Sequence, residues 1–341
     1  MATPRIAIIF TGGTIAMRSD TGSGGNVPTL DADALLASVP GLADVAEVVP
    51  IDWGLVPASH LTFAQVLEIG GILAEQLSRP DVSGAVVVQG TDVIEETAFA
   101  WDLLPMPAKP IVVVGAMRSA SEEGYDGPDN LRNAVIAAAD ASLADQGVVV
   151  AMAGEIHGAD DVRKTHTHAL DTFRSPNRGR LGTVVDGSVA LERTRTPARL
   201  PRVPERAALP VHLLTYALET DARALAAIGE PLPGGLVVAA AGGGNTPPDF
   251  LALGRRLMAA GVPVALTTRC PSGQARPGYA FEGGSSQWWE SGALFTGTID
   301  GPKARVLLAL GLGAGLSLAE LTPICEAFGG GRAAGPRVPA G

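Results

Sequence analysis

A buried strand that runs directly into a helix is the feature that most constrains this chain, and it lies at residues 85–97 (AVVVQGTDVIEET). The valine-rich run is typical of a strand buried on both faces, as in a parallel sheet. The strand ends at Gly90, and Thr91 and Asp92 open the helical pattern. Asp92 and Glu95 have the spacing of a helix N-cap and its capping box. Ligands of open α/β sheets bind at the carboxyl ends of strands, and helix N-termini favour anions or a developing oxyanion. This position therefore makes Thr91 and Asp92 candidates for function, although both residue types also serve simply as caps.

A second strand-to-turn unit of the same kind opens the chain. The apolar run Arg5–Phe10 is followed by TGGTIA at residues 11–16. Two glycines allow a tight turn, and the hydroxyl of Thr14 stands where the strand has ended. A glycine-rich turn can also cradle a phosphate, but neither the dinucleotide fingerprint nor the P-loop pattern is present. A nucleotide site is therefore not expected here.

Length and composition indicate a compact protein of two domains. The chain has 341 residues, of which 46% are hydrophobic and 18% charged, which is more than one ordinary core accommodates. The net charge of −10 argues against nucleic acid and against an anionic membrane surface as partners. Two distant cysteines, Cys270 and Cys325, form no disulfide framework and suit a reducing cytosol. With no signal-like N-terminus and no membrane-length apolar run, a soluble cytoplasmic protein is expected.

Strands and helices are expected to alternate along the first half of the chain. This alternation predicts a largely parallel sheet with helices on both faces. The polar segment Arg18–Asn26 (RSDTGSGGN) is typical of a mobile loop and is a candidate lid beside Thr14. The predicted elements after the first strand are a helix over 31–38, a strand over 46–51, a loop over 54–60, a helix over 62–77, the central strand with its helix to 104, a strand over 111–114, a helix over 127–144 and a strand over 147–152.

A change of composition separates the two predicted domains. Residues 195–210 (RTPARLPRVPERAALP) carry four prolines and four arginines, which is typical of a linker. The predicted domains are therefore 1–194 and 211–328, and the glycine-rich tail 329–341 is predicted to be disordered. In the second domain the pattern predicts strands over 211–215, 235–240 and 262–268, and helices from 221, after 248, over 303–310 and over 316–328.

Six segments, in order, resemble motifs of the bacterial L-asparaginase/glutaminase family. They are TGGTIA at 11–16, QGTDVIEETA at 89–98, VVGAMR at 113–118, DGPDNLRNAV at 126–135, DVRKT at 161–165 and KARVLL at 303–308. The resemblance extends from about residue 5 to about residue 327. It implies an α/β fold of two domains, with a larger N-terminal parallel-sheet domain and a smaller C-terminal α/β domain. It also implies a cofactor-free amidohydrolase that converts L-asparagine and water to L-aspartate and ammonia.

The resemblance assigns roles to four residues. Thr14 matches the family's nucleophile, which attacks the side-chain amide and forms an acyl-enzyme. Thr91, Asp92 and Lys164 match a hydrogen-bonded triad, in which Asp92 would also hold the substrate's α-ammonium group. A threonine needs a base beside it, and a lysine can serve if burial or a neighbouring cation lowers its pKa. The family forms homotetramers, dimers of intimate dimers, in which a partner subunit's C-terminal domain completes each site.

The substrate-binding residues expected from the resemblance are Ala58, Ser59, Gly90, Asp92, Asn245 and Glu282. Two of these assignments depart from the family's pattern. The family's usual carboxylate-binding serine is replaced by Ala58, with Ser59 one position along, and this change predicts an altered substrate preference. The partner subunit's glutamate aligns with Ser285 by strict counting, so that Glu282 could serve only through a loop shift.

A third departure concerns tyrosine. The family activates its first threonine with a tyrosine of the mobile loop, whereas here that position falls on Gly25 or Asn26. The three tyrosines of the chain are Tyr125, Tyr216 and Tyr279. Thr14 would then be activated differently, for instance by Lys164 through Thr91, or react slowly.

Several alternatives remain open at the level of sequence. The chain could hydrolyse another amide, such as glutamine, a D-isomer or a bulkier or cyclic amide, or it could bind an amino acid without catalysis. The Trp288–Trp289 pair could line an enlarged pocket, although such pairs more often pack. His157, His166 and His168 lie near acidic residues, but no third ligand has a recognisable spacing, so no metal is expected.

Overall fold

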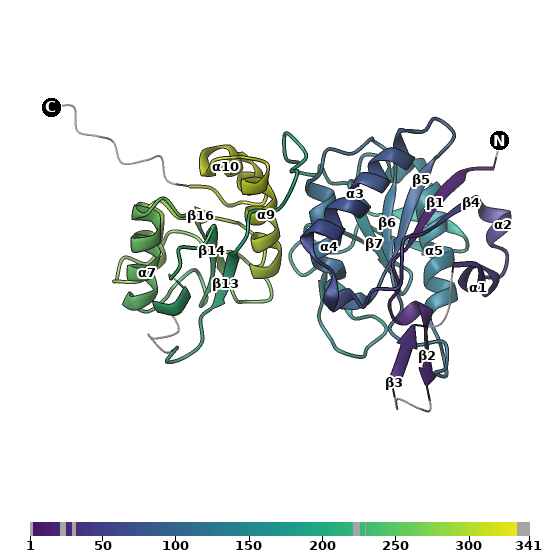
Figure 1. The fold of residues 1–341 in the computed structure, drawn as a ribbon, viewed down its shortest axis with the longest axis horizontal. Helices are drawn as coiled ribbons and strands as arrows, with labels where there is room; N and C mark the ends of the chain where they lie inside the picture. The colour runs from purple at the N-terminus through teal and green to yellow at the C-terminus, as the bar shows by residue number, and fades with distance from the viewer. Residues whose placement is uncertain (1–2, 21–24, 29–31, 221–225, 229, 333–341) are drawn as a thin grey trace. The chain divides into compact units, whose positions relative to one another are not determined.

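The computed structural model describes residues 3–20, 25–28, 32–220, 226–228 and 230–332. It divides into two compact units, residues 1–197 and 198–341, which are drawn in Figure 1. The division falls inside the proline-rich segment 195–210. Each unit is a sheet covered by helices, which confirms the predicted α/β fold class.

The N-terminal unit is built on an eight-stranded sheet in the order β12-β11-β8-β7-β6-β5-β1-β4. The five strands from β7 to β4 pair in parallel, and β8, β11 and β12 extend the sheet with antiparallel pairing. The parallel strands β5 and β6 are buried along their whole length, as their valine-rich sequences predict. The strands are β1 (Arg5–Phe10), β4 (Glu47–Asp52), β5 (Gly84–Val88), β6 (Ile111–Val114), β7 (Val148–Met152), β8 (Glu155–Gly158), β11 (Gly182–Val185) and β12 (Ser188–Leu191).

Helices cover both faces of this sheet. In Figure 1, α3 and α4 lie on one face and α5 on the other. Thr62 caps α3 and forms a capping box with Gln65, which is a local reason for the helix to begin there. The helices are α1 (Ala32–Ala37), α2 (Leu42–Val45), α3 (Phe63–Ser78), α4 (Ile94–Leu103) and α5 (Gly127–Ala139), with 3₁₀ turns η1 (Thr14–Ala16), η2 (Ala58–His60), η3 (Thr91–Val93) and η4 (Ala141–Leu143).

Two predicted elements of this unit differ in the structure. The helix predicted over 127–144 ends at Ala139, because Asp140 is extended and its side chain accepts a hydrogen bond from Ser142 N, which opens η4. The segment predicted as a loop over 18–26 carries strands at both ends: β2 (Met17–Asp20) pairs with β3 (Gly25–Pro28). Residues 21–24, the centre of the predicted lid, lie outside the described residues.

The C-terminal unit has a four-stranded parallel sheet in the order β13-β14-β15-β16. Figure 1 shows α7 and α9 on either side of it. The start of the helix predicted from Asp221 lies outside the described residues. Residues 226–228, which are described, are helical. The elements are β13 (Val211–Thr215), β14 (Gly235–Ala240), β15 (Val264–Thr268), β16 (Leu294–Phe295), α7 (Pro248–Ala259), α8 (Ser285–Glu290), α9 (Gly301–Gly313) and α10 (Leu318–Ala327).

The predicted disorder of the tail is wrong for its first residues. Gly331 forms an antiparallel bridge with Phe295, and Gly331 N donates a 2.8 Å hydrogen bond to Phe295 O. Backbone pairing of this kind does not depend on side chains, so the glycine-rich composition did not predict it. Residues 333–341 lie outside the described residues.

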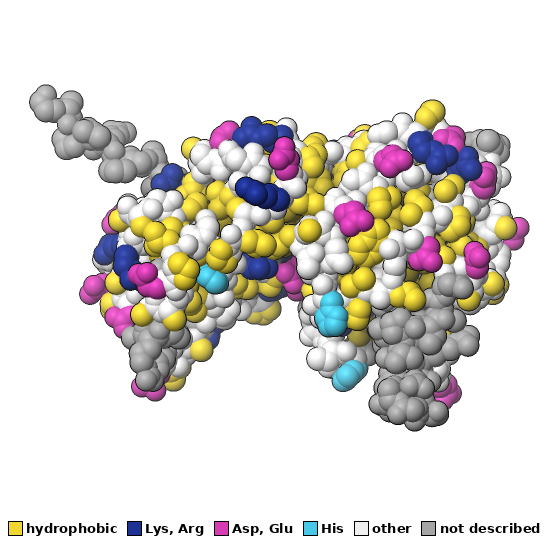
Figure 2. Space-filling model, in the orientation of Figure 1, with side chains coloured by type: hydrophobic (Ala, Val, Ile, Leu, Met, Phe, Trp, Pro, Cys, Tyr) yellow, Lys and Arg dark blue, Asp and Glu magenta, His cyan; other side chains and the backbone are white. Residues whose placement is uncertain are grey.

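The surface carries charges of both signs. On the face drawn in Figure 2, acidic and basic side chains are interspersed among apolar ones. Within the described ranges, no helix combines the length and apolar character needed to cross a membrane.

Candidate active site

Three loops meet backbone to backbone at the carboxyl ends of the neighbouring strands β4, β1 and β5. A Cβ atom built on Gly13 would lie 2.1 Å from Gly90 N, and one built on Gly12 would lie 3.0 Å from Val56 N. A Cβ on Gly90 would lie 2.8 Å from the Cβ of Ala58. Since only glycine tolerates such approaches, these residues bring the Thr14 turn, the Thr91 turn and the Ala58 turn together.

The Thr14 turn is tied to its neighbours by hydrogen bonds. Thr11 Oγ1 donates to Val88 O at 3.0 Å, and Val56 N donates to Thr11 O at 2.9 Å. Thr14 itself is partly exposed at the head of η1. The structure thus places a reachable threonine hydroxyl next to the loop that carries Thr91.

Thr91, Asp92 and Lys164 form one hydrogen-bonded group. Lys164 Nζ donates to Thr91 Oγ1 at 2.8 Å and to Asp92 Oδ1 at 3.4 Å. Thr91 is 5% exposed, whereas the side chains of Lys164 and Asp92 are 19% and 63% exposed. A neutral lysine amine at this distance can accept the threonine proton, and an exposed carboxylate can bind an ammonium group.

Lys164 is held in place by a short hairpin and by α4. The two-residue strand β9 (Arg163–Lys164) pairs with β10 (Phe173–Arg174). On its other side, Lys164 N donates to Glu95 Oε2 at 2.8 Å. The hairpin was not predicted from the sequence, because two-residue strands carry no detectable period.

The predicted capping box of Asp92 and Glu95 is wrong. The chain enters α4 through η3, and neither element has a side-chain cap hydrogen bond at its N-terminus. The physical reason is competition from β9, since Asp92 accepts a hydrogen bond from Lys164 Nζ and Glu95 accepts one from the Lys164 backbone N–H.

The loop after β6 borders the same group. A Cβ on Gly115 would lie 3.0 Å from Thr91 Cγ2, and Asn130 Nδ2 donates to Gly115 O at 3.1 Å. Asp126 accepts hydrogen bonds from Met117 N and Arg118 N. The DGPDNL segment at 126–131 therefore supports the loop beside Thr91. Tyr125 directly precedes this segment, and its hydroxyl donates to Ile15 O.

Ala58 and Ser59 occupy different environments. Ala58 is 4% exposed and packs against Gly90, whereas Ser59 is exposed. The structure thus brings Ala58, but not the hydroxyl of Ser59, into the packed centre of the three loops.

In the C-terminal unit, Asn245 lies beside α8. Asn245 Oδ1 accepts a hydrogen bond from Ser285 N at 3.3 Å. The Ser285 side chain is buried, while Glu282, on the loop before α8, is exposed. Of these two, Glu282 presents its side chain to solvent.

The tryptophan pair packs into the C-terminal unit. Trp288 is fully buried in the core of the unit, and its Nε1 donates to Thr246 Oγ1 at 2.9 Å. Trp289 meets the ring of Phe295 edge-on. The pair is therefore structural.

His157 and His166 form hydrogen bonds within the protein. His157 Nδ1 lies 3.0 Å from Ser175 Oγ, and burial lowers the pKa of His157 to about 4. His166 Nδ1 accepts hydrogen bonds from the backbone N–H groups of His168 and Ala169. Among the described residues, no group of three or more potential metal ligands occurs.

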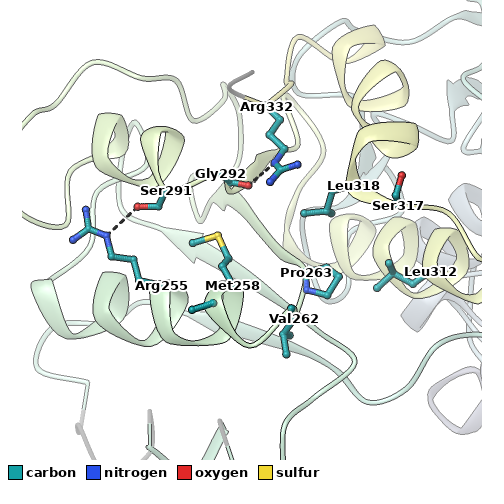
Figure 3. Close-up of a pocket in the computed structure, with 12 residues that line it drawn as sticks. Arg255, Met258, Val262, Pro263, Ser291, Gly292, Leu312, Ser317, Leu318 and Arg332 are labelled. Atoms are coloured by element: carbon teal, nitrogen blue, oxygen red, sulfur yellow. Dashed lines mark hydrogen bonds between the residues drawn. The ribbon is translucent and has the colours of Figure 1, made fainter. Parts of the chain in front are cut away.

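A cavity of about 670 Å³ lies within the C-terminal unit beside α7 and α10, and Figure 3 shows its lining. Arg255 Nε donates to Ser291 Oγ at 3.0 Å, and Arg332 Nε donates to Gly292 O at 2.7 Å. None of the residues predicted from the sequence lines this cavity, so it is distinct from the candidate active site.

Known proteins resemble the chain along nearly its whole length. The family model "Asparaginase, N-terminal" matches residues 5–197, and "Glutaminase/Asparaginase C-terminal domain" matches residues 210–324. A probable periplasmic L-asparaginase of Haemophilus influenzae is 34% identical over 91% of this chain and 88% of its own length. L-asparaginase 2 of Escherichia coli is 32% identical over 92% of this chain and 90% of its own. The crystal structure of a probable cytoplasmic L-asparaginase from Campylobacter jejuni superposes with a TM-score of 0.80 at 30% identity, covering 95% of this chain and 99% of that one. The chain belongs to the asparaginase family.

Proposed function

We propose that this protein is an L-asparaginase, which converts L-asparagine and water to L-aspartate and ammonia without a cofactor. The observation that carries the proposal is the Lys164–Thr91–Asp92 group, with Lys164 Nζ 2.8 Å from Thr91 Oγ1. It stands beside the Thr14 turn through the contact of Gly13 with Gly90. Membership of the asparaginase family supports the same reaction.

In the proposed reaction, Thr14 Oγ1 attacks the side-chain amide carbon of asparagine. A C–O bond forms, the C–N bond breaks, and ammonia leaves with the proton that the threonine gives up. Water then attacks the acyl-enzyme, which releases aspartate and restores the Thr14 hydroxyl. Backbone N–H groups near Thr14 and Thr91 would stabilise the oxyanion.

Lys164 and Asp92 have separate parts in this proposal. Lys164, as a neutral amine, accepts a proton by way of the Thr91 hydroxyl. In the first step this makes the Thr14 hydroxyl a better nucleophile, and in the second step it activates the attacking water. Asp92, whose carboxylate is largely exposed, binds the α-ammonium group of the substrate. Ala58 and Gly90, which lie in contact, would border the bound substrate on the η2 side.

The proposal extends to a cytoplasmic homotetramer, a dimer of intimate dimers. Asn245 and Glu282 would complete the site of a neighbouring subunit from the C-terminal unit. Two free cysteines, Cys270 and Cys325, are in keeping with a reducing compartment. Sedimentation velocity tests the assembly: a tetramer is expected, and a stable monomer with full activity would contradict it.

The function is tested by ammonia release from L-asparagine with three proteins. Wild-type protein should release ammonia, and Thr91→Ala should lose at least about 10³-fold in kcat, as expected when a nucleophile or its partner is removed. Thr322→Ala is the matched control, since Thr322 lies in α10 of the C-terminal unit and its hydroxyl donates back to Leu318 O of the same helix. Full activity of a folded Thr91→Ala protein would overturn the triad.

A different amide is the second candidate, favoured by the buried methyl group of Ala58 in place of a hydroxyl. A panel of L-asparagine, L-glutamine, D-asparagine and a cyclic amide would distinguish the two, by the ratio of kcat/KM values. Calorimetric binding of an amino acid without any ammonia release would instead identify a catalytically silent relative.

A further inference from the structure

Tyr125 joins the loop after β6 to the turn that carries Thr14. Its phenolic Oη donates a 2.5 Å hydrogen bond to Ile15 O. The two residues are 110 positions apart in the chain. Ile15 follows Thr14 directly in η1, so the bond holds the Ile15–Ala16 peptide unit, one residue beyond the proposed nucleophile.

The direction of the Tyr125 ring is set by the backbone around it. A Cβ atom built on Gly127 would lie 2.4 Å from Cε2, Cζ and Oη of the ring, so the ring lies directly over this glycine. The preceding loop is anchored by Asp126, which accepts hydrogen bonds from Met117 N and Arg118 N. Tyr125 therefore extends from a fixed base toward η1.

The Thr14 turn needs such support. η1 has three residues and no acidic residue in its first turn, and short 3₁₀ turns have poor hydrogen-bond geometry of their own. A nucleophile that drifts by about 1 Å loses on the order of 100-fold in rate. A hydrogen bond from outside η1 to the Ile15 carbonyl restricts this drift.

We infer that Tyr125 is the positioning residue of Thr14, which holds the η1 turn in its reactive geometry through the Ile15 carbonyl. The effect on turnover rests on the proposed function, because it presupposes Thr14 as the nucleophile. The effect on the turn itself does not depend on it. In this chain the residues 18–26 contain no tyrosine, so Tyr125 supplies a phenol to this turn from another segment.

The test compares Tyr125→Phe with Tyr216→Phe. Tyr125→Phe removes only the hydroxyl and should lower kcat about tenfold, which is the effect of a small misplacement, with KM within about twofold and an unchanged pH profile. Tyr216→Phe, in the C-terminal unit, should match wild type. Hydrogen–deuterium exchange of the peptide over residues 11–17 should be faster in Tyr125→Phe only.

Gly127→Ala should disrupt the same Tyr125–Ile15 hydrogen bond in a second way. Its methyl group would displace the Tyr125 ring, so this variant should also lower kcat about tenfold, while adding little in the Tyr125→Phe background. Additive losses would show that Gly127→Ala acts elsewhere and would contradict the inference.

Three outcomes overturn the inference: wild-type kcat in Tyr125→Phe, unchanged exchange over 11–17, or a shifted pH profile, which would assign Tyr125 to proton transfer. If wild-type protein releases no ammonia from any amide, the proposed function fails. The exchange measurement still decides whether Tyr125 orders the Thr14 turn.

Discussion

Gly13 allows the Thr14 turn and the Thr91 turn to pack backbone against backbone. Its φ of +97° is one that side-chain-bearing residues rarely adopt, and the position of its absent Cβ is 2.1 Å from Gly90 N. Both features require glycine, and together they explain why two hydroxyl-bearing turns from different strands can share one site.

Gly13→Ala should therefore abolish activity and destabilise the N-terminal unit. Gly187→Ala is the matched control: Gly187 also has a positive φ, +74°, but its Cβ would meet nothing within 4 Å. Gly187→Ala should lower the free energy of unfolding only by the backbone strain, about 1–2 kcal/mol, and should retain activity. Urea denaturation with an ammonia assay measures both, and equal stability losses in the two variants would contradict the role of the Gly13–Gly90 contact.

His157 should make the protein sensitive to mild acid. Burial lowers its folded pKa to about 4 from an ordinary value of 6.5, so the unfolded chain binds more protons between these two values. The contribution of His157 to the free energy of unfolding is then fully present above pH 6.5. It is lost as the pH drops toward 4, by up to about 3 kcal/mol.

The measurement is the free energy of unfolding in urea at several pH values between 4 and 7. His157→Gln should flatten this dependence, whatever its own cost at neutral pH. His168→Gln, at an exposed histidine, should leave the slope of wild type. A slope in His157→Gln as steep as in wild type would assign the acid sensitivity to other groups.

At the scale of elements, α4 positions the hairpin that carries Lys164. β9 has only two residues, and it is held by β10 on one side and by Glu95 on the other. A strand this short has few hydrogen bonds of its own, so the bond from Lys164 N to Glu95 Oε2 contributes a large share of its order.

Glu95→Ala should lower kcat about tenfold or more, since Lys164 Nζ would lose its fixed distance to Thr91 Oγ1. Glu95→Gln keeps an acceptor oxygen and should retain more activity. Glu75→Ala, on the exposed side of α3, removes the same charge and should have no effect. Equal activity of Glu95→Ala and wild type in the ammonia assay would show that β9 is ordered without α4.

At the scale of the whole molecule, a buried ionic group attaches the last residues of the N-terminal unit to its core. Arg195 pairs with Asp102 of α4, and Arg195 Nε lies 3.1 Å from Asp160 Oδ1. Its Nη1 also donates to Gln146 O at 2.8 Å. All three ionic side chains are at most 5% exposed, and Asp102 in particular depends on Arg195 for compensation of its charge.

Arg195→Met should lower the free energy of unfolding of the N-terminal unit by about 3–5 kcal/mol, because it leaves the buried Asp102 without its cation and Asp160 with the more exposed Arg178 at 3.7 Å. The exposed pair of Arg256 and Glu230 supplies the comparison, and Arg256→Met should have a much smaller effect. Chemical denaturation followed by circular dichroism measures both. A similar small effect of the two variants would mean that Asp102 and Asp160 are compensated by other groups or are neutral.

The local patterns of the sequence determined the α/β class, the parallel strands and the positions of both threonine turns. Burial on both faces and tight turns restrict residue type directly. A few residues therefore suffice to predict a buried strand such as Gly84–Val88 or a glycine turn such as Gly12–Gly13. The family motifs likewise lie in short, contiguous segments. The roles assigned through them to Thr14, Thr91, Asp92 and Lys164 stay predictions until the variants are measured.

The partners of the candidate site residues were determined only by the tertiary structure. Asp92 and Glu95 have the spacing of a capping box, yet both turn to Lys164, about 70 residues away. The strands β8 to β12 are too short to show a period, and the bond from Tyr125 to Ile15 has no local signal at all. Such contacts depend on where the topology brings distant segments together, and a side chain takes the partner that compensates its charge or hydrogen bond best in that place.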